Sequence, residues 1–103
     1  MEKKDEKPLF TLSVTAEIIG VHPRTLMIYE NKEIVIPTRT KTNRRRYSQR
    51  DVRKLQFVRY LTNKRRVNLS GVKCILDILN KLEKEDLDPK KESFPDFIES
   101  SVF

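Results

Sequence analysis

The sequence predicts a single, mainly α-helical domain with four helices and one small β-hairpin, and three observations lead to this class. Two short stretches of helical periodicity flank Gly20, and two longer ones follow Ser48 and Asn68. Residues 36–47, between these pairs, contain strand-favouring Thr and Tyr together with a turn-forming Asn43. A chain of 103 residues has room for one modest core, so one domain is expected.

The first two helices are predicted on either side of a tight turn at residues 20–22. Ser13 is expected to cap the first helix, because its hydroxyl can accept a hydrogen bond from a first-turn N–H group. Gly20 should end this helix, since glycine enters the left-handed conformation without steric cost. Pro23 suits the first position of the second helix, where its missing N–H costs nothing. The predicted apolar faces consist of Val14, Ala16, Ile18, Ile19, Leu26, Ile28 and Tyr29.

This layout is that of a helix-turn-helix, in which the second helix enters the DNA major groove. The same layout also occurs in small helical proteins that do not bind DNA, so the rest of the chain has to decide between the two.

Short strands are predicted before and after the helix pair. Residues 9–12 form an apolar entry that favours a brief strand or a hydrophobic staple onto the first helix. Residues 36–47 favour a β-hairpin with a tip rich in Lys and Arg, which we call the wing. The predicted fold is therefore a mainly α winged helix-turn-helix.

The third and fourth helices are predicted from their caps and apolar stripes. Ser48 and Asp51 form a variant of the capping box at the start of the third helix, which should fade near residues 62–63. Asn68 or Ser70 is expected to cap the fourth helix, after a basic loop at residues 63–67. The expected buried positions are Val52, Leu55, Phe57, Val58 and Leu61, then Val72, Ile75, Leu76, Leu79 and Leu82.

Charge divides the chain into three segments. Residues 1–8 are neutral overall and are expected to form a disordered leader, whereas residues 9–82, the predicted DNA-binding domain, carry sixteen Lys/Arg and five acids. Residues 83–103 carry three Lys and seven acids and contain two prolines, which predicts an acidic tail without a long helix. Apolar residues of this tail are expected to dock on the domain or on a partner: Phe94, Phe97, Ile98, Val102 and Phe103.

The basic excess gives a net charge of +7 and a pI near 9.7, which is typical of proteins that bind polyanions. Residues 44–46 with Tyr47, and residues 64–66, are candidate phosphate contacts, because guanidinium groups and a tyrosine hydroxyl can donate to phosphate oxygens. The alternative is that both are solvated basic loops. His22 is either a base contact at the start of the second helix or part of the turn.

Several other classes find little support. The single cysteine, Cys74, excludes an internal disulfide and a Cys-rich zinc site, and its apolar neighbours predict a buried side chain. We expect no metal site, no cofactor and no enzyme activity, because neither a Gly-rich phosphate loop nor a nucleophile-base arrangement is recognisable. The sequence has no apolar run of membrane-spanning length and no secretory signal, so a cytoplasmic protein is predicted.

The sequence resembles the MerR family of bacterial transcription regulators. The matching motifs are TAEIIGVHPRTLMIYE, the Pro37–Arg39 step, RRRY in the wing and the following SQRDV, and together they span residues 9–82. Within this family VHPRTL, RRYS and VNLSGVKCIL are most similar to the HspR-type heat-shock repressors, and the nitrogen-regulator branch is the nearest competitor. This branch implies a repressor of chaperone genes that binds inverted repeats, often with the DnaK chaperone as co-repressor. It also implies a bacterial, nucleoid-associated protein.

The resemblance places the family's recognition-helix contacts on Arg24, Thr25 and Tyr29, its wing pattern on Arg45 and Tyr47, and its second wing on residues 64–66. Combined with the basic clusters, the full candidate set for DNA contact is His22, Arg24, Thr25, Tyr29, Arg39, Lys41, Arg44, Arg45, Arg46, Tyr47, Lys64, Arg65 and Arg66.

Three features depart from the family pattern. Met27 replaces an arginine that usually contacts phosphate, and Glu33 replaces the glycine after the recognition helix, so that helix could end differently. The long coiled-coil helix that makes the family's homodimer has no clear counterpart in residues 83–103. Two other functions therefore stay open: an excisionase-like or phage architectural protein that bends DNA, and a protein-binding module that uses the acidic tail.

Overall fold

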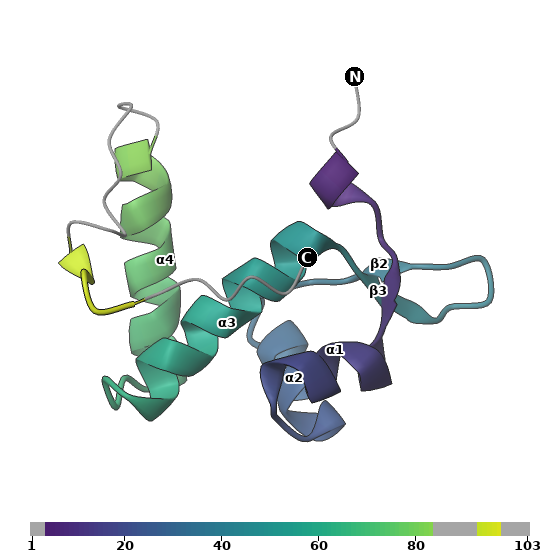
Figure 1. The fold of residues 1–103 in the computed structure, drawn as a ribbon, viewed down its shortest axis with the longest axis horizontal. Coiled ribbons are helices and arrows are strands. Elements are labelled where there is room, and N and C mark those ends of the chain that lie inside the picture. The colour runs from purple at the N-terminus through teal and green to yellow at the C-terminus, as the bar shows by residue number, and fades with distance from the viewer. Residues whose placement is uncertain (1–3, 84–92, 98–103) are drawn as a thin grey trace.

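The structure, a computed structural model, describes residues 4–83 and 93–97. The elements in chain order are η1 (Lys4–Glu6), β1 (Phe10–Thr11), α1 (Leu12–Ile19), α2 (Pro23–Asn31), β2 (Thr38–Arg39), β3 (Arg45–Tyr47), α3 (Gln49–Asn63) and α4 (Leu69–Glu83). Figure 1 shows α1 and α2 together beside α3, with the β2–β3 hairpin projecting at one end and α4 at the other. The predicted fold class, mainly α with four α-helices and a small hairpin, is confirmed in the described part of the chain.

The predicted cap of α1 is wrong by two residues. The helix begins at Leu12, and the hydroxyl of Thr11, not of Ser13, accepts a hydrogen bond from the N–H of Val14 at 3.2 Å. Thr11 is also the last residue of β1, so its extended backbone serves the strand and the cap at once. Ser13 lies in the first turn and is exposed.

The turn between α1 and α2 forms as predicted. Gly20 has φ +81°, in the left-handed region, and its N–H donates to the carbonyl oxygen of Ala16. The nearest atom to a Cβ at this position would be Nη1 of Arg59, the end of a flexible side chain on α3, so the left-handed backbone conformation is the main reason for glycine here. The same nitrogen donates to the carbonyl oxygen of Ile19, which ties the end of α1 to α3.

The apolar entry at residues 9–12 contains β1, the first of its two predicted possibilities, and this strand adds a third strand to the wing. The strand order is β1-β3-β2, and both pairs are antiparallel. Phe10 pairs with Tyr47 and Thr38 pairs with Arg46, so β3 is the central strand. Asn43 has φ +62°, which confirms its role as the turn residue of the hairpin.

The end of α2 explains how Glu33 replaces the family's glycine. Glu33 has φ +58°, so the chain leaves the helix through the left-handed conformation that a glycine adopts without strain. Its N–H donates to the carbonyl oxygen of Glu30, and the following N–H, of Ile34, donates to that of Tyr29. The helix therefore ends at Asn31 through a left-handed residue as a glycine would end it, with some backbone strain at Glu33.

The capping box of α3 is confirmed. The Ser48 hydroxyl accepts from the N–H of Asp51, and the Asp51 carboxylate accepts from the N–H of Ser48, both at 3.0 Å. The apolar stripe of α3 belongs to the core, and α3 contacts α1, α4 and η1. The buried apolar residues are Ala16, Ile19, Leu26, Tyr29, Ile34, Val35, Tyr47, Val52, Leu55, Phe57, Val58, Tyr60, Leu61, Val72 and Leu79. Val14 and Ile28, which were expected in the helix-pair core, are exposed.

Asn68 caps α4, since its Oδ1 accepts from the N–H of Gly71 at 2.8 Å. The helix buries Val72 and Leu79 against α3, in agreement with the predicted stripe. The prediction for Cys74 is wrong, because this thiol is exposed. Cys74 lies two positions after Val72, which is about 200° around a helix, so it faces away from the core.

Residues near both ends of the described chain contact α3. Within the expected leader, Asp5 pairs with Arg53 at 2.5 Å and Glu6 pairs with Arg50 at 3.0 Å. Phe94 and Phe97 dock on the domain as one of the two predicted possibilities, with ring contacts to Phe57 and Tyr60. Ile98, Val102 and Phe103 lie outside the described residues.

Candidate nucleic-acid interface

The N-terminal turn of α2 presents the residues expected to read DNA bases. His22 is the N-cap: its Nδ1 accepts from the N–H of Arg24 at 3.0 Å, so the histidine has a structural role in the turn while its ring is exposed. Arg24 is exposed and Thr25 is half-buried beside it. Pro23 suits the first position of α2, and Arg24 follows it as an exposed residue of the first turn.

The wing is attached to α2 through one carboxylate. Oε1 of Glu30 accepts from Nε of Arg45 at 2.7 Å, and Oε2 of Glu30 accepts from Nη2 of Arg39 at 2.8 Å. Arg39 also donates to the carbonyl oxygen of Asn43 in the wing turn. One residue of α2 thus orients an arginine on each strand of the hairpin.

The electrostatics of Glu30 follow from this geometry. Partial burial acts to raise its pKa, but the hydrogen bonds and charges of Arg45 and Arg39 outweigh burial and hold the pKa below its ordinary value of 4.5. Glu30 is therefore ionised at neutral pH and neutralises part of the positive charge on both arginines.

The tip of the wing carries the cations that extend furthest from the core. Lys41 and Arg44 are exposed, and the Thr40 hydroxyl accepts from the N–H of Arg44 at 3.1 Å, which stabilises the turn beneath them. Arg46, on β3, is half-buried and donates to the carbonyl oxygen of Arg45 at 2.8 Å. Of the three arginines at residues 44–46, Arg44 is the one best placed for a phosphate.

The structure does not bring the two candidate tyrosines to the surface. Tyr29 is 5% exposed and Tyr47 is 1% exposed, and both belong to the hydrophobic core. Burial, with the negative charge of Glu30, raises the pKa of Tyr47 to about 12. Both rings therefore pack in the core, and phosphate contact by their hydroxyls stays a prediction.

A second basic loop, residues 64–68, joins α3 to α4. Lys64, Arg65 and Arg66 are exposed, and Arg66 has φ +55°, so the loop reverses direction at this residue. The Arg65 guanidinium lies 5.4 Å from the centre of the Phe94 ring and 3.8 Å from Oδ1 of Asp96. This loop therefore has a partner in residues 93–97 that its sequence did not predict.

Figure 1 shows where the elements that carry the candidate basic residues lie. The wing lies at one end, the α1–α2 pair in the middle, and the turn from α3 into α4 at the other end, in a molecule about 40 Å in its longest dimension. A central helix flanked by two basic loops suits a duplex, whose phosphates continue on both sides of the groove that the helix enters.

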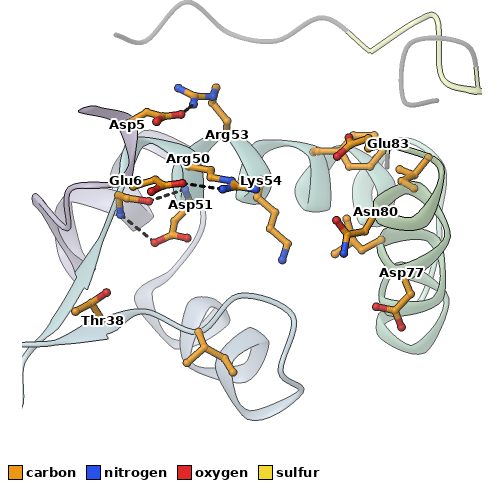
Figure 2. A pocket seen from close by; sticks show the side chains of 15 residues that line it. Asp5, Glu6, Thr38, Arg50, Asp51, Arg53, Lys54, Asp77, Asn80 and Glu83 are labelled. Atoms are coloured by element: carbon orange, nitrogen blue, oxygen red, sulfur yellow. Dashed lines mark hydrogen bonds and ion pairs between the residues drawn. The ribbon is translucent and has the colours of Figure 1, made fainter. Parts of the chain in front are cut away.

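A pocket of about 710 Å³ between α3, α4 and the leader lies apart from these residues. Figure 2 shows Lys54 extending into the space between α3 and α4, with Asp77 and Asn80 on the α4 side. The ion pairs of Asp5 and Glu6 with α3 form one wall. None of the candidate DNA-contacting residues lines it.

Sequence reasoning missed two residues that organise the interface. Glu30 lies within a quoted motif, but nothing in the sequence indicated that it would meet Arg39 and Arg45, nine and fifteen residues later. Asp96 was counted only as one of the tail acids, and its partner Tyr60 only as a helical residue. Neither contact could be predicted from the sequence, because each joins residues of two separate elements.

Within the part of the chain that the structure describes, no helix has the length and hydropathy that a membrane crossing requires.

Comparison with known proteins adds independent support. The profile of the MerR HTH family regulatory proteins matches residues 10–78. The putative heat shock protein HspR of Streptomyces coelicolor is 37% identical over 81 residues, which cover 79% of this chain and 54% of that protein. The HTH-type transcriptional regulator GlnR of Bacillus anthracis is 32% identical over 92 residues, or 89% of this chain and 70% of that protein. The HTH-type transcriptional regulator TnrA of Bacillus subtilis is 25% identical over 85 residues, covering 82% and 74% of the two chains.

The chain thus spans about half the length of the Streptomyces relative. The match of residues 10–78 contains the helix pair, the wing, all of α3 and most of α4. The resemblance inferred from the sequence motifs is confirmed, and the chain belongs to the MerR family of helix-turn-helix regulatory proteins.

Proposed function

We propose that this protein binds double-stranded DNA in a sequence-specific manner and regulates transcription. The observation that carries this proposal is the exposed Arg24 at the N-terminal turn of α2, flanked by basic loops at both ends of the molecule. An arginine at this place can donate two hydrogen bonds to a guanine edge in the major groove.

The proposed division of labour follows the geometry. Arg24, with Thr25 and His22 beside it, reads base edges, whereas Lys41, Arg44, Lys64 and Arg66 bind phosphates that fix the register. Three further arginines lie near the expected position of the DNA backbone. Glu30 orients Arg39 and Arg45, and the carbonyl oxygen of Arg45 on β3 orients Arg46. In a homodimer on an inverted repeat, two copies of α2 would lie about one DNA turn apart or a multiple of it.

The finer proposal is that the regulated genes encode heat-shock proteins or chaperones and that the effect is repression. Its support is the 37% identity, over 79% of this chain, to a protein named putative heat shock protein. A DnaK-type co-repressor and a bacterial cytoplasmic, nucleoid-associated location belong to the same proposal. The GlnR match covers more of this chain at lower identity, and it favours a nitrogen-metabolism operator as the second candidate.

Fluorescence anisotropy with three duplexes tests these proposals: a chaperone-gene promoter, a nitrogen-metabolism promoter and a scrambled sequence. We expect the chaperone fragment to bind many-fold tighter than the scrambled one, with affinity falling steeply as salt rises. Arg24→Ala should reduce this preference about 10- to 100-fold, the usual value of a bidentate base contact. Lys54→Ala, which removes an equal charge from the α3–α4 pocket, is the matched control.

Light scattering on the same samples gives the number of chains per duplex. Equal binding of all three duplexes by a monomer would contradict sequence-specific regulation by this chain and would favour an architectural protein. Preference for the nitrogen-metabolism fragment would keep DNA binding and replace the heat-shock proposal.

A further inference from the structure

Residues 93–97, which we call the tail segment, are seated on α3 and on the second basic loop. Phe94 and Phe97 contact the Phe57 ring edge-on, with centroids 5.5 and 5.0 Å away, and both rings also contact Tyr60. The segment is turned back on itself, since the N–H of Phe97 donates to the carbonyl oxygen of Phe94 at 3.1 Å. Two aromatic side chains thereby occupy the surface of α3 near its C-terminal end.

Asp96 is held between these rings at the edge of the basic loop. Its Oδ1 accepts from the hydroxyl of Tyr60 at 2.6 Å and lies 3.8 Å from Nη1 of Arg65. The hydrogen bond from Tyr60, together with the charges of Arg65 and Lys64, keeps the pKa of Asp96 below its ordinary value despite opposing desolvation. Asp96 is therefore a fixed negative charge beside residues 64–66.

The position of Arg65 is a consequence of this arrangement. Its guanidinium lies 5.4 Å from the centre of the Phe94 ring and is drawn toward Asp96. A guanidinium stacked on a ring and paired with a carboxylate does not offer its donor fork freely to a phosphate. Asp96 also repels any phosphate that approaches Lys64 or Arg65.

The tail segment is attached by contacts that can open. The side chains of Arg65 and Asp96 are 47% and 52% exposed, and exposed ion pairs contribute little and are screened by salt. A pocket of about 330 Å³ remains between Asp96, Phe97 and α3, so the segment does not fill its site. These features fit a reversible ligand better than a permanent part of the core.

We propose that the tail segment is a built-in competitor of nucleic acid, which occupies the aromatic site on α3 and withdraws Arg65 from phosphate binding. This inference rests on the proposed DNA-binding function. It adds a competition in which a DNA phosphate and the Asp96 carboxylate bind the same Arg65 guanidinium. Any modification or partner that displaces residues 93–97 then raises affinity for DNA of any sequence.

The test measures affinity for a duplex of scrambled sequence, because phosphate contacts do not depend on bases. Asp96→Asn removes the competing charge and should tighten binding about 2- to 5-fold, the range expected for one exposed ion pair. The slope of log affinity against log salt should steepen by up to about 0.9, the value for one added phosphate contact. Asp77→Asn, at an exposed carboxylate on α4, changes the net charge equally and is the control.

Tyr60→Phe provides a second variant without any change in charge. It keeps the ring that contacts Phe57 and removes the hydroxyl that holds Asp96, so it should shift affinity in the same direction as Asp96→Asn. In a ¹H–¹⁵N spectrum of the wild-type chain, amide signals of residues 93–97 should move when the duplex is added.

The outcomes separate the two proposals. If wild type and Asp96→Asn both fail to bind any duplex, DNA binding itself is refuted, and the competition with it. If wild type binds but Asp96→Asn matches Asp77→Asn, only the competition is refuted. Weaker binding by Asp96→Asn would also overturn it, since the tail segment would then position Arg65 for phosphate.

Discussion

Glu30 shows how one side chain can link a reading helix to a wing. Its carboxylate accepts from Arg45 on β3 and from Arg39 on β2, so the hairpin cannot rotate against α2 without breaking a charge-assisted hydrogen bond. The carboxylate is 18% exposed, which screens these pairs less than pairs on the open surface. In the proposed complex, these contacts would determine where the wing tip meets a duplex.

This role predicts a pH-dependent cost for Glu30→Gln. The pKa of Glu30 is lower in the folded than in the unfolded chain, so the ion pairs stabilise the fold fully above the unfolded value near 4.5. That stabilisation is lost as pH falls through the folded pKa. Glu30→Gln should lower the free energy of unfolding by about 1 kcal/mol at pH 7 and by less at pH 3.5, which lies below the unfolded pKa.

Urea unfolding followed by far-UV circular dichroism at both pH values measures this difference. Glu17→Gln, at an exposed carboxylate on α1, is the matched control and should cost little at either pH. A Glu30→Gln cost that stays equal at pH 7 and 3.5 would mean that the amide is poorly accommodated for reasons other than charge.

At the scale of elements, the start of α1 shows where sequence reasoning loses accuracy. Ser13 and Thr11 are both good capping residues, and only the pairing of β1 with β3 selects Thr11. Thr11→Ala should therefore destabilise the fold by about 1 kcal/mol, whereas Ser13→Ala should stay within about 0.5 kcal/mol. Thermal unfolding of the two variants checks this. An equal loss of stability in both would contradict the assignment of the cap to Thr11 alone.

Most elements could be predicted because their signals are local. Gly20, Pro23, the Ser48–Asp51 capping box and the apolar stripe of α3 depend on neighbours within one turn or one helix. Burial of Tyr47 and exposure of Cys74 depend on which face of an element meets the core, which local composition does not determine. The exposed cations of the candidate interface could accordingly be recognised from the sequence, whereas the side chains that join separate elements could not.

Across the whole molecule, positive charge is concentrated on loops that flank the helix pair, and acids lie where they control these loops. Glu30 anchors the wing, and Asp96 lies beside the second basic loop. This arrangement separates two energetic roles, since α2 can supply preference among sequences while the loops supply affinity that depends on salt.

Arg44→Ala tests that separation. Arg44 is exposed in the turn of the wing, on a different element from the first turn of α2, so its loss should weaken binding to chaperone-promoter and scrambled duplexes by the same factor. The salt slope should fall by about 0.9 for one lost phosphate contact, while the ratio of the two affinities stays constant. Lys81→Ala, in the last turn of α4, removes the same charge and should leave both quantities close to wild type.

A changed affinity ratio in Arg44→Ala would contradict the separation of roles, because it would mean that the wing itself discriminates between sequences. Base contacts or DNA deformation at the wing could both produce that result, and varying the base pairs beneath the wing would distinguish them. With the ratio unchanged and the slope reduced, specificity is assigned to α2, and the wing acts as a phosphate clamp whose position Glu30 determines.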